Sequence, residues 1–144
     1  KWPKRVIFLD YFTLAERYEG MISELMKVGD SQDRYYYGTS ERLIVHFFGG
    51  KVEVVLEFNR FDPYMNLDLI KTEKDARGKG YASKVMNIIT ESADEFGVNM
   101  ELDAIPQDNE GLSRTELINF YKKFGFEFIG EYGMDFMRRK YKTQ

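Results

Sequence analysis

A strand, a helix and a second strand in direct succession, at residues 65–104, constrain this chain more than any other part of its sequence. Residues 80–96 carry apolar side chains at helical spacing along one stripe, and Gly97 follows as a helix stop. The segments 65–72 and 98–104 on either side are short, apolar and typical of strands. Two such strands joined through a helix predict a parallel pair with a right-handed crossover.

Hairpins are predicted on both sides of this unit. Residues 43–48 and 52–58 are rich in β-branched and aromatic side chains, and Gly49 and Gly50 lie between them. Residues 126–132 and 134–141 look like a closing pair of strands around a further glycine. Because hairpin strands pair antiparallel, we expect an α/β (α+β) fold. It would have one mixed, mostly antiparallel sheet, a central βαβ unit and helices on both faces.

Capping motifs predict two more helices. Thr13 with Glu16, and Ser113 with Glu116, each form a capping box at the start of an amphipathic stretch. The remaining segments are predicted as a strand at 6–9 and as a loop or short helix at 31–39. In the strand at 65–72, strict alternation places one set of side chains on each face. One face would carry Asn66, Asp68, Ile70 and Thr72, and the other Met65, Leu67, Leu69 and Lys71.

Composition limits the classes of function. With 144 residues, of which 43% are hydrophobic, the chain suits a single domain over residues 1–144. The net charge of -3 gives no reason to expect a nucleic-acid partner. The absence of cysteine excludes disulfides, thiolate metal sites and cysteine nucleophiles, and fits a reducing compartment. No apolar run has the length of a membrane span and no leader pattern opens the chain, so we expect a cytoplasmic protein without membrane contact.

The charged turn between the strand at 65–72 and the long helix carries the chemistry. From Lys71 to Lys84, five cationic side chains stand against two acidic ones, in a chain that is acidic overall. A glycine-rich turn at a helix N-terminus suits a phosphate, because free N–H groups and the helix dipole favour an anion there. The pattern therefore predicts a phosphate-binding turn, against the alternative of a solvated turn with a capping glycine.

Two well-known phosphate-binding motifs are absent or incomplete. The P-loop pattern does not occur. The dinucleotide fingerprint lacks its third glycine, where Ser83 stands, although Glu101 and Asp103 lie at roughly the distance of its ribose-binding acid. Only one parallel unit is predicted and hairpins flank it, so a nicotinamide cofactor is a distant alternative.

Two motifs together resemble the GNAT acetyltransferase superfamily. Residues 77–82, Arg-Gly-Lys-Gly-Tyr-Ala, match its Arg/Gln-x-x-Gly-x-Gly/Ala signature, and residues 119–126 match its later aromatic-Tyr-x-x-x-Gly-Phe segment. The resemblance covers residues 64–132 and implies a GNAT-like fold. It also implies an N-acetyltransferase that moves an acetyl group from acetyl-CoA directly to a primary amine, on a small molecule or a protein, without a metal. A catalytically silent module that binds CoA and regulates a partner is the alternative.

The resemblance also implies the cofactor-binding residues. Backbone amides of the turn at 77–82 would hold the CoA pyrophosphate, and the pantetheine arm would lie between the strands at 65–72 and 98–104. We therefore expect these strands to part near residues 72 and 104. Arg114 stands where many members carry an asparagine that helps to hold CoA. The implied residues are Ile70, Lys71, Thr72, Arg77, Gly78, Lys79, Gly80, Tyr81, Ala82 and Arg114.

Catalytic roles follow from the same resemblance. Tyr121 would protonate the departing CoA thiolate, whereas its helical stripe alone would make it a core residue. Asp68 is the first candidate to accept the proton of the amine, because its strand lines the predicted site. The alternatives are Glu101, Asp103, His46 and an ordered water. The adjacent Tyr35, Tyr36 and Tyr37 could line an acceptor pocket, form the contact of a homodimer or cover the core.

Overall fold

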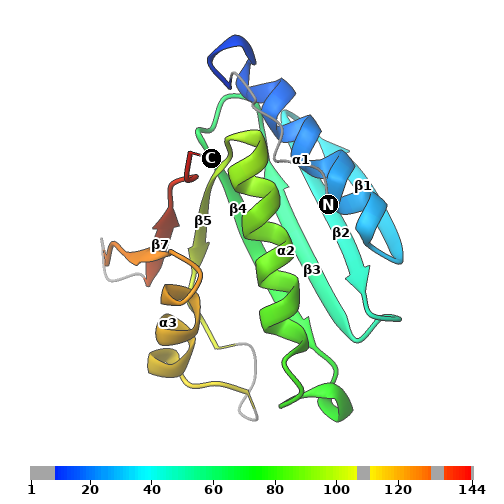
Figure 1. The fold of residues 1–144 in the computed structure, drawn as a ribbon, viewed down its shortest axis with the longest axis vertical. Helices are drawn as coiled ribbons and strands as arrows, with labels where there is room; N and C mark the ends of the chain where they lie inside the picture. Colours follow the sequence, from blue (N-terminus) through cyan, green and yellow to red (C-terminus); the bar gives the residue numbers. More distant parts are fainter. Residues whose placement is uncertain (1–8, 107–110, 131–134, 144) are drawn as a thin grey trace.

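The computed structural model of the chain describes residues 9–106, 111–130 and 135–143. In these ranges, seven strands form one sheet in the order β1-β2-β3-β4-β5-β7-β6. β4 and β5 are parallel, and the other neighbouring strands are antiparallel. The sheet is therefore mixed and mostly antiparallel around a central βαβ unit, as predicted (Figure 1). The strands are β1 (Ser31–Tyr37), β2 (Ser40–Phe47), β3 (Val52–Phe58), β4 (Tyr64–Thr72), β5 (Asn99–Asp103), β6 (Glu127–Phe128) and β7 (Phe136–Arg139).

α1 and α3 start at the predicted capping boxes, and α2 stops at the predicted Gly97. Thr13 and Ser113 each accept a hydrogen bond from the backbone N–H three residues further on, which completes both predicted capping boxes. Gly97, with a φ of 68°, gives the central helix a left-handed C-terminal cap, a conformation that glycine adopts without steric cost. The helices are α1 (Leu14–Val28), α2 (Tyr81–Phe96) and α3 (Arg114–Lys122), with short 3-10 turns at Leu9–Tyr11 and Lys74–Ala76.

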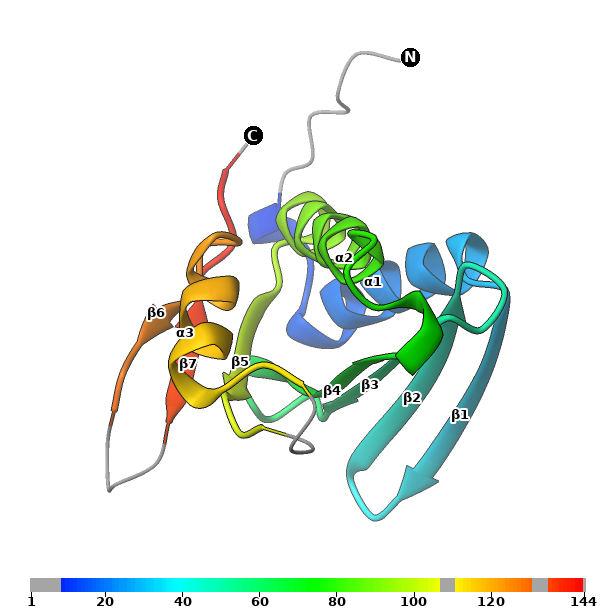
Figure 2. The ribbon, with the colours of Figure 1, turned by 90° about the horizontal axis from the view of Figure 1, so that it is seen from below.

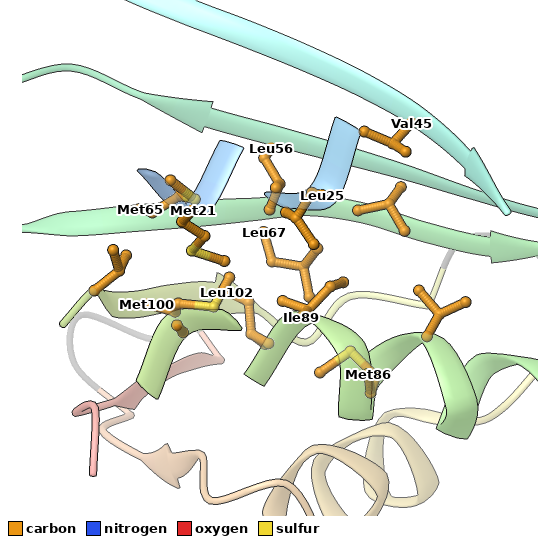
Figure 3. Close-up of a cluster of buried hydrophobic side chains, with 14 of the residues drawn as sticks. Met21, Leu25, Val45, Leu56, Met65, Leu67, Met86, Ile89, Met100 and Leu102 are labelled. Atoms are coloured by element: carbon orange, nitrogen blue, oxygen red, sulfur yellow. The ribbon is translucent and has the colours of Figure 1, made fainter. Parts of the chain in front are cut away.

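α1 and α2 lie side by side on one face of the sheet (Figures 1 and 2). Gly20 allows them to approach closely, because a Cβ at this position would lie 2.5 Å from the ring of Phe96 on α2. Helix propensity alone disfavours this glycine, so packing explains its presence in α1. The two helices and the sheet enclose a core whose labelled members in Figure 3 are Met21, Leu25, Val45, Leu56, Met65, Leu67, Met86, Ile89, Met100 and Leu102, all of them buried.

Residues 31–37 form an edge strand, so the predicted loop or short helix is wrong. β1 pairs with β2 along its whole length. Six of its seven side chains are exposed, so no alternation of apolar and polar residues marks it as a strand. It forms because β2 offers a complete row of backbone partners and Gly38, with a φ of 60°, turns the chain back. Tyr35, Tyr36 and Tyr37 are exposed at this edge and do not cover the core.

β4 contains a β-bulge that the sequence pattern does not reveal. The register between β3 and β4 shifts between Val55 and Leu56. Leu56 pairs with Leu67 and Val55 pairs with Leu69, which leaves Asp68 without a partner on β3. One extra residue in a strand reverses the alternation of its faces beyond that point.

The bulge overturns the predicted faces of β4. Ile70 and Thr72 pair with the buried Val54 and Val52 and therefore point to the core side of the sheet. Asn66 pairs with a residue of β3 on the opposite face. The prediction that Asn66 shares a face with Ile70 and Thr72 is wrong, because it assumes a strand without a bulge.

The parallel ladder of β4 and β5 includes all of β5 except its last residue, but only the first half of β4. Their parallel ladder ends where Leu67 pairs with Leu102. Beyond this point β4 stays paired with β3 as far as Thr72. The residue after β5 pairs on the side of β7 instead, where the N–H of Ala104 donates to the carbonyl of Asp135 at 3.0 Å. The predicted parting of the two strands is therefore confirmed.

Two predicted segments lie partly outside the described residues. Of the predicted strand at 6–9 only Leu9 is described, and it begins a 3-10 turn. β6 and β7 pair antiparallel as predicted but are shorter than the two predicted strands. Residues 131–134, between them, lie outside the described ranges.

A buried ion pair ties β7 to α2. Arg139, which is 4% exposed, donates from its two terminal nitrogens to the carboxylate of Asp94 at 2.8 and 3.0 Å. Its Nε donates to the carbonyl of Phe124, just beyond α3, at 2.7 Å. One guanidinium therefore links α2, the end of α3 and β7.

We expect Asp94→Asn to lower the free energy of unfolding by about 3 kcal/mol, because it leaves the buried guanidinium of Arg139 without a compensating charge. Arg114→Gln is the control. It breaks an ion pair with Asp135 in which the Arg114 side chain is 54% exposed, so it should cost much less than Asp94→Asn. Urea unfolding of both variants measures the difference, and equal losses would contradict the importance of the buried pair.

Candidate active site

A cleft of about 440 Å³ opens where β4 and β5 part. Its walls are the second half of β4, the turn before α2, the end of β5 and one side of α3. Figure 1 labels the strands and helices concerned. Most of the predicted site residues line it, whereas Lys79 and Arg114 are not part of the lining. The predicted residues that line the cleft are Asp68, Ile70, Lys71, Thr72, Arg77, Gly78, Gly80, Tyr81, Ala82 and Tyr121.

The N-terminus of α2 lies at this cleft without a side-chain cap. α1 and α3 both begin with capping boxes, but α2 begins after Gly80, which supplies no capping side chain. The first backbone N–H groups of α2 therefore lack the partner that a capping residue would provide. The first turn of α2 also contains no acidic residue, so no local charge offsets the positive end of the helix dipole.

Two glycines keep the turn before α2 open. Gly78 and Gly80 have φ angles of 76° and 80°, in the left-handed region that favours glycine. Both line the cleft, and a Cβ at either position would meet no atom within 4 Å. The backbone of the turn is therefore uncovered by side chains at these two positions. These features fit the phosphate group that the sequence predicts for this turn.

Two cations bring positive charge to the cleft wall. Lys71 and Arg77 both line the cleft. Arg77 Nε also donates to the carbonyl of Thr72 at 3.3 Å, which fixes the shape of the turn. Arg114 lies outside the lining, and its Nε donates to the carboxylate of Asp135 at 2.6 Å. The contact of Arg114 with CoA stays a prediction.

Tyr121 belongs to the core and also borders the cleft. Only 8% of its surface is exposed, and its ring packs edge to face on Phe120 and Phe126, with ring centres 5.3 and 5.9 Å apart. Burial raises the pKa of Tyr121 to about 12, so the phenol is protonated throughout the neutral range. The residue can therefore donate a proton at the cleft, and its acid role stays a prediction.

Two carboxylates stand where β4 and β5 part. Asp68 and Asp103 are each the first residue after the last paired position of their strand, and both line the cleft. Asp68 forms an ion pair with Arg42 at 2.8 Å. In contrast, Oδ1 of Asp103 is buried and has no hydrogen-bond partner among the described residues. Burial, and then the negative charge of Asp135, raise the pKa of Asp103.

The other predicted proton acceptors are engaged elsewhere on the sheet. Glu101 pairs with Arg138 of β7 at 2.7 Å. His46 lies between Ser31 and Glu53, with its Nδ1 at 3.2 Å from the Ser31 hydroxyl and its Nε2 at 3.1 Å from the Glu53 carboxylate. Neither Glu101 nor His46 is part of the cleft lining.

Leu117 and Phe120 line the cleft from α3, although neither is among the predicted site residues. They share the i, i+3, i+4 stripe with Tyr121, and this spacing is the signal that could have identified them. Tyr35, Tyr36 and Tyr37, by contrast, lie on β1 at the far edge of the sheet and are not in the lining (Figure 2).

In the part of the chain that the structure describes, no group of three or more histidine, aspartate or glutamate side chains is placed to hold a metal ion. In the same ranges, no helix has the length and apolar character needed to cross a membrane. The absence of a metal and of a nucleic-acid partner, the single domain, the homodimer and the cytoplasmic location stay predictions.

The combination of fold and cleft defines an α/β protein whose central parallel strands part beside a glycine-rich turn at a helix N-terminus. Residues 7–126 match the acetyltransferase (GNAT) family. The matched range contains both parting strands, the glycine turn and Tyr121. The chain therefore belongs to the GNAT acetyltransferase family, and the protein is an acyltransferase of this type.

Solved structures share this fold. The anti-CRISPR protein AcrVA5 aligns with a TM-score of 0.51 at 19% identity, over 75% of this chain and 97% of that one. A putative GNAT acetyltransferase from Bacteroides thetaiotaomicron aligns with a TM-score of 0.51 at 15% identity, over 96% of this chain and 86% of that one. Nourseothricin acetyltransferase aligns with a TM-score of 0.50 at 18% identity, over 72% of this chain and only 66% of that one. No curated protein sequence matches the chain.

Alkaline pH should weaken the fold through Tyr121. Burial raises the pKa of the Tyr121 phenol from 10.0 to about 12 in the folded state. The folded protein therefore favours the neutral phenol, and this contribution to the free energy of unfolding is lost as the pH rises from 10.0 to about 12. Tyr121→Phe cannot ionise, so its free energy of unfolding should fall less steeply than that of the wild type over this pH range. Urea unfolding at several pH values measures both slopes.

Tyr18 supplies a common background for this comparison. Burial raises its pKa as well, and it is present in both proteins. The difference between the two slopes therefore reports Tyr121 alone. Identical slopes would show that the Tyr121 phenol is not buried in the way described.

Proposed function

We propose that the protein transfers the acetyl group of acetyl-CoA directly to a primary amine, carried by a small molecule or by a protein. The observation that carries this proposal is the cleft between the parting strands, which borders an uncapped helix N-terminus. Membership of the GNAT family supports acetyl transfer from acetyl-CoA. The carboxylates and the phenol at the cleft support an acceptor that must lose a proton.

The turn before α2 would hold the phosphates of CoA. The first N–H groups of α2 and the positive end of its dipole attract anionic oxygens. Gly78 and Gly80 let the backbone approach them closely, because they carry no Cβ. Arg77 would add charge at the cleft wall, and Lys79, which is exposed in the same turn, would add charge from the solvent side.

The cleft-side edge of β4 would hold the pantetheine arm. Beyond Leu67, β4 pairs with β3 but not with β5 in the residues described. Backbone groups from Ile70 to Thr72 can therefore pair with the amides of the arm, as they would with an added strand. A backbone N–H of this edge could also stabilise negative charge on the acetyl oxygen.

Acetyl-CoA supplies an acetyl thioester, and groups of the protein would move the protons. Tyr121, protonated at neutral pH because its pKa is about 12, would donate its proton to the departing sulfur. Asp68 or Asp103, where the strands part, would accept the proton of the amine. Leu117 and Phe120 would keep water away from the thioester, because they give this part of the wall an apolar surface.

Acetyl-CoA should raise the melting temperature of the protein, because a ligand that binds only the folded state stabilises it, by about 2.7 kcal/mol at about 100 times its Kd. Gly80→Ala should reduce this gain, because Gly80 lines the cleft with a φ of 80°, which strains an alanine and would distort the turn. Gly38→Ala is the matched control, since Gly38 also has a positive φ and open space but lies in the turn between β1 and β2. Equal stabilisation by NAD, or none by any CoA species, would refute the proposed cofactor.

Tyr121→Phe should lower turnover on the order of 100-fold, because it removes the proton donor and keeps the ring. The thermal shift with acetyl-CoA should be unchanged. Tyr36→Phe, at the exposed edge strand, is the control for losing a hydroxyl and should keep wild-type turnover. Release of CoA with a panel of primary amines measures the rates.

Two outcomes of this experiment would change the proposal. Full turnover per folded molecule in Tyr121→Phe would remove the acid role from Tyr121. A wild-type protein that binds acetyl-CoA but releases no CoA with any amine would favour the CoA-binding regulatory module instead.

A further inference from the structure

Asp68 and Asp103 are the first residues beyond the paired part of β4 and β5. The ladder ends at the pair Leu67 and Leu102, and the next residue on each strand is an aspartate that lines the cleft. Two carboxylates at equivalent points of the opening can have different roles, because their surroundings differ.

Asp68 is held in a charge network on β2 and β3. Nη2 of Arg42 lies 2.8 Å from Oδ2 of Asp68, and its Nη1 lies 3.1 Å from the carboxylate of Glu57. The charge of Asp68 is therefore already paired with a cation of the sheet.

Asp103 has no such partner in residues 9–106, 111–130 and 135–143. Its Oδ1 is buried and makes no hydrogen bond there. A carboxylate oxygen away from water and without a donor is costly while it is charged, and protonation relieves that cost. Burial and the negative charge of Asp135 raise the pKa of Asp103, and a hydrogen bond from the backbone N–H of Asp135 offsets part of this effect.

The acidic neighbours of Asp103 on the other elements are already engaged. Asp135, before β7, accepts a hydrogen bond from Arg114 at 2.6 Å. Glu116 on α3 accepts one from the backbone N–H of Ser113 at 3.1 Å, in the capping box of its helix. The titratable and charged groups that line the cleft together with Asp103 are Asp68, Lys71, Arg77, Tyr81, Glu116 and Tyr121.

We propose that Asp103, rather than Asp68, accepts the proton of the acceptor amine. This assignment rests on the proposed acetyl transfer. Asp103 takes one proton from the ammonium group, and the freed nitrogen lone pair forms the N–C bond to the acetyl carbon. The C–S bond breaks, its electron pair leaves on sulfur, and sulfur takes the proton of Tyr121. The second proton that nitrogen loses restores Tyr121 through solvent, and Asp103 releases its proton to water.

The acceptor class follows from this geometry. Asp103 is negatively charged when the amine binds, so it attracts an alkylammonium group, which is protonated at neutral pH. Lys71 and Arg77, the cations of the lining, lie on the end of β4 and on the turn before α2. The carboxylate side of the cleft therefore suits a cationic amine.

Asp103→Asn and Asp68→Asn, compared with wild type over a range of pH, test the assignment. For a primary alkyl amine, Asp103→Asn should lower kcat/KM by about 100-fold or more and abolish its fall at acidic pH. Asp68→Asn should keep that acidic fall and lose less than about 10-fold, because it leaves the proton acceptor in place. Asp103→Glu, which keeps a carboxylate, should recover part of the rate.

Thermal melting supplies a readout that does not depend on turnover. Because the pKa of Asp103 is raised in the folded state, its charged form opposes folding at neutral pH. Asp103→Asn should therefore melt at a higher temperature than wild type at neutral pH, and this gain should shrink as the pH falls. The thermal shift with acetyl-CoA should be the same in wild type and in both Asn variants.

The outcomes separate this assignment from the proposed function. Asp103→Asn with wild-type kcat/KM and an unchanged acidic fall would overturn the assignment and leave acetyl transfer standing. A lower melting temperature of Asp103→Asn at neutral pH would also overturn it, because the carboxylate would then be a structural partner. A wild-type protein without CoA release for any amine would refute the proposed function itself.

Discussion

The structure depends on how the two edges of β4 are paired. One edge stays paired with β3 as far as Thr72, and the other is paired with β5 only as far as Leu67. Buried backbone groups need partners, so the end of β5 finds one on its other side, where Ala104 donates to Asp135 at 3.0 Å. The bulge at Asp68 bends β4 at the same place. The cleft is therefore built into the sheet, which positions side chains more firmly than a loop would.

Two features of the cleft are unfavourable for stability and suit binding and chemistry. α2 lacks the side-chain cap that α1 and α3 have, and a glycine in place of a capping side chain costs roughly a few tenths of a kcal/mol. Asp103 keeps a buried carboxylate oxygen without a hydrogen-bond partner in the ranges described. Natural proteins break local rules of this kind mainly at functional sites, where a ligand supplies the missing interaction. An anion at α2 and a cationic amine at Asp103 would each supply one.

The sequence predicts the elements that local interactions specify. The capping boxes at Thr13 and Ser113 and the glycine stop at Gly97 depend on residues within one turn of each other, so they can be read directly. The edge strand β1 and the bulge at Asp68 depend on pairing with another strand. The residues of β1 show no alternation of apolar and polar side chains, and the alternation in β4 is misleading because of the bulge. The predicted loop at 31–39 and the predicted faces of β4 are wrong for this reason.

The sequence by itself determined the family, the central βαβ unit and the glycine-rich turn before α2. Gly78 and Gly80 set the backbone of this turn locally, and its motif is contiguous in the chain. Only the tertiary structure decided which carboxylate has a partner. Arg42 reaches Asp68 from β2, whereas Asp103 receives no such cation in the part of the chain that the structure describes. Such pairings depend on strand register and on the bulge, and these are settled by the packing of the whole sheet.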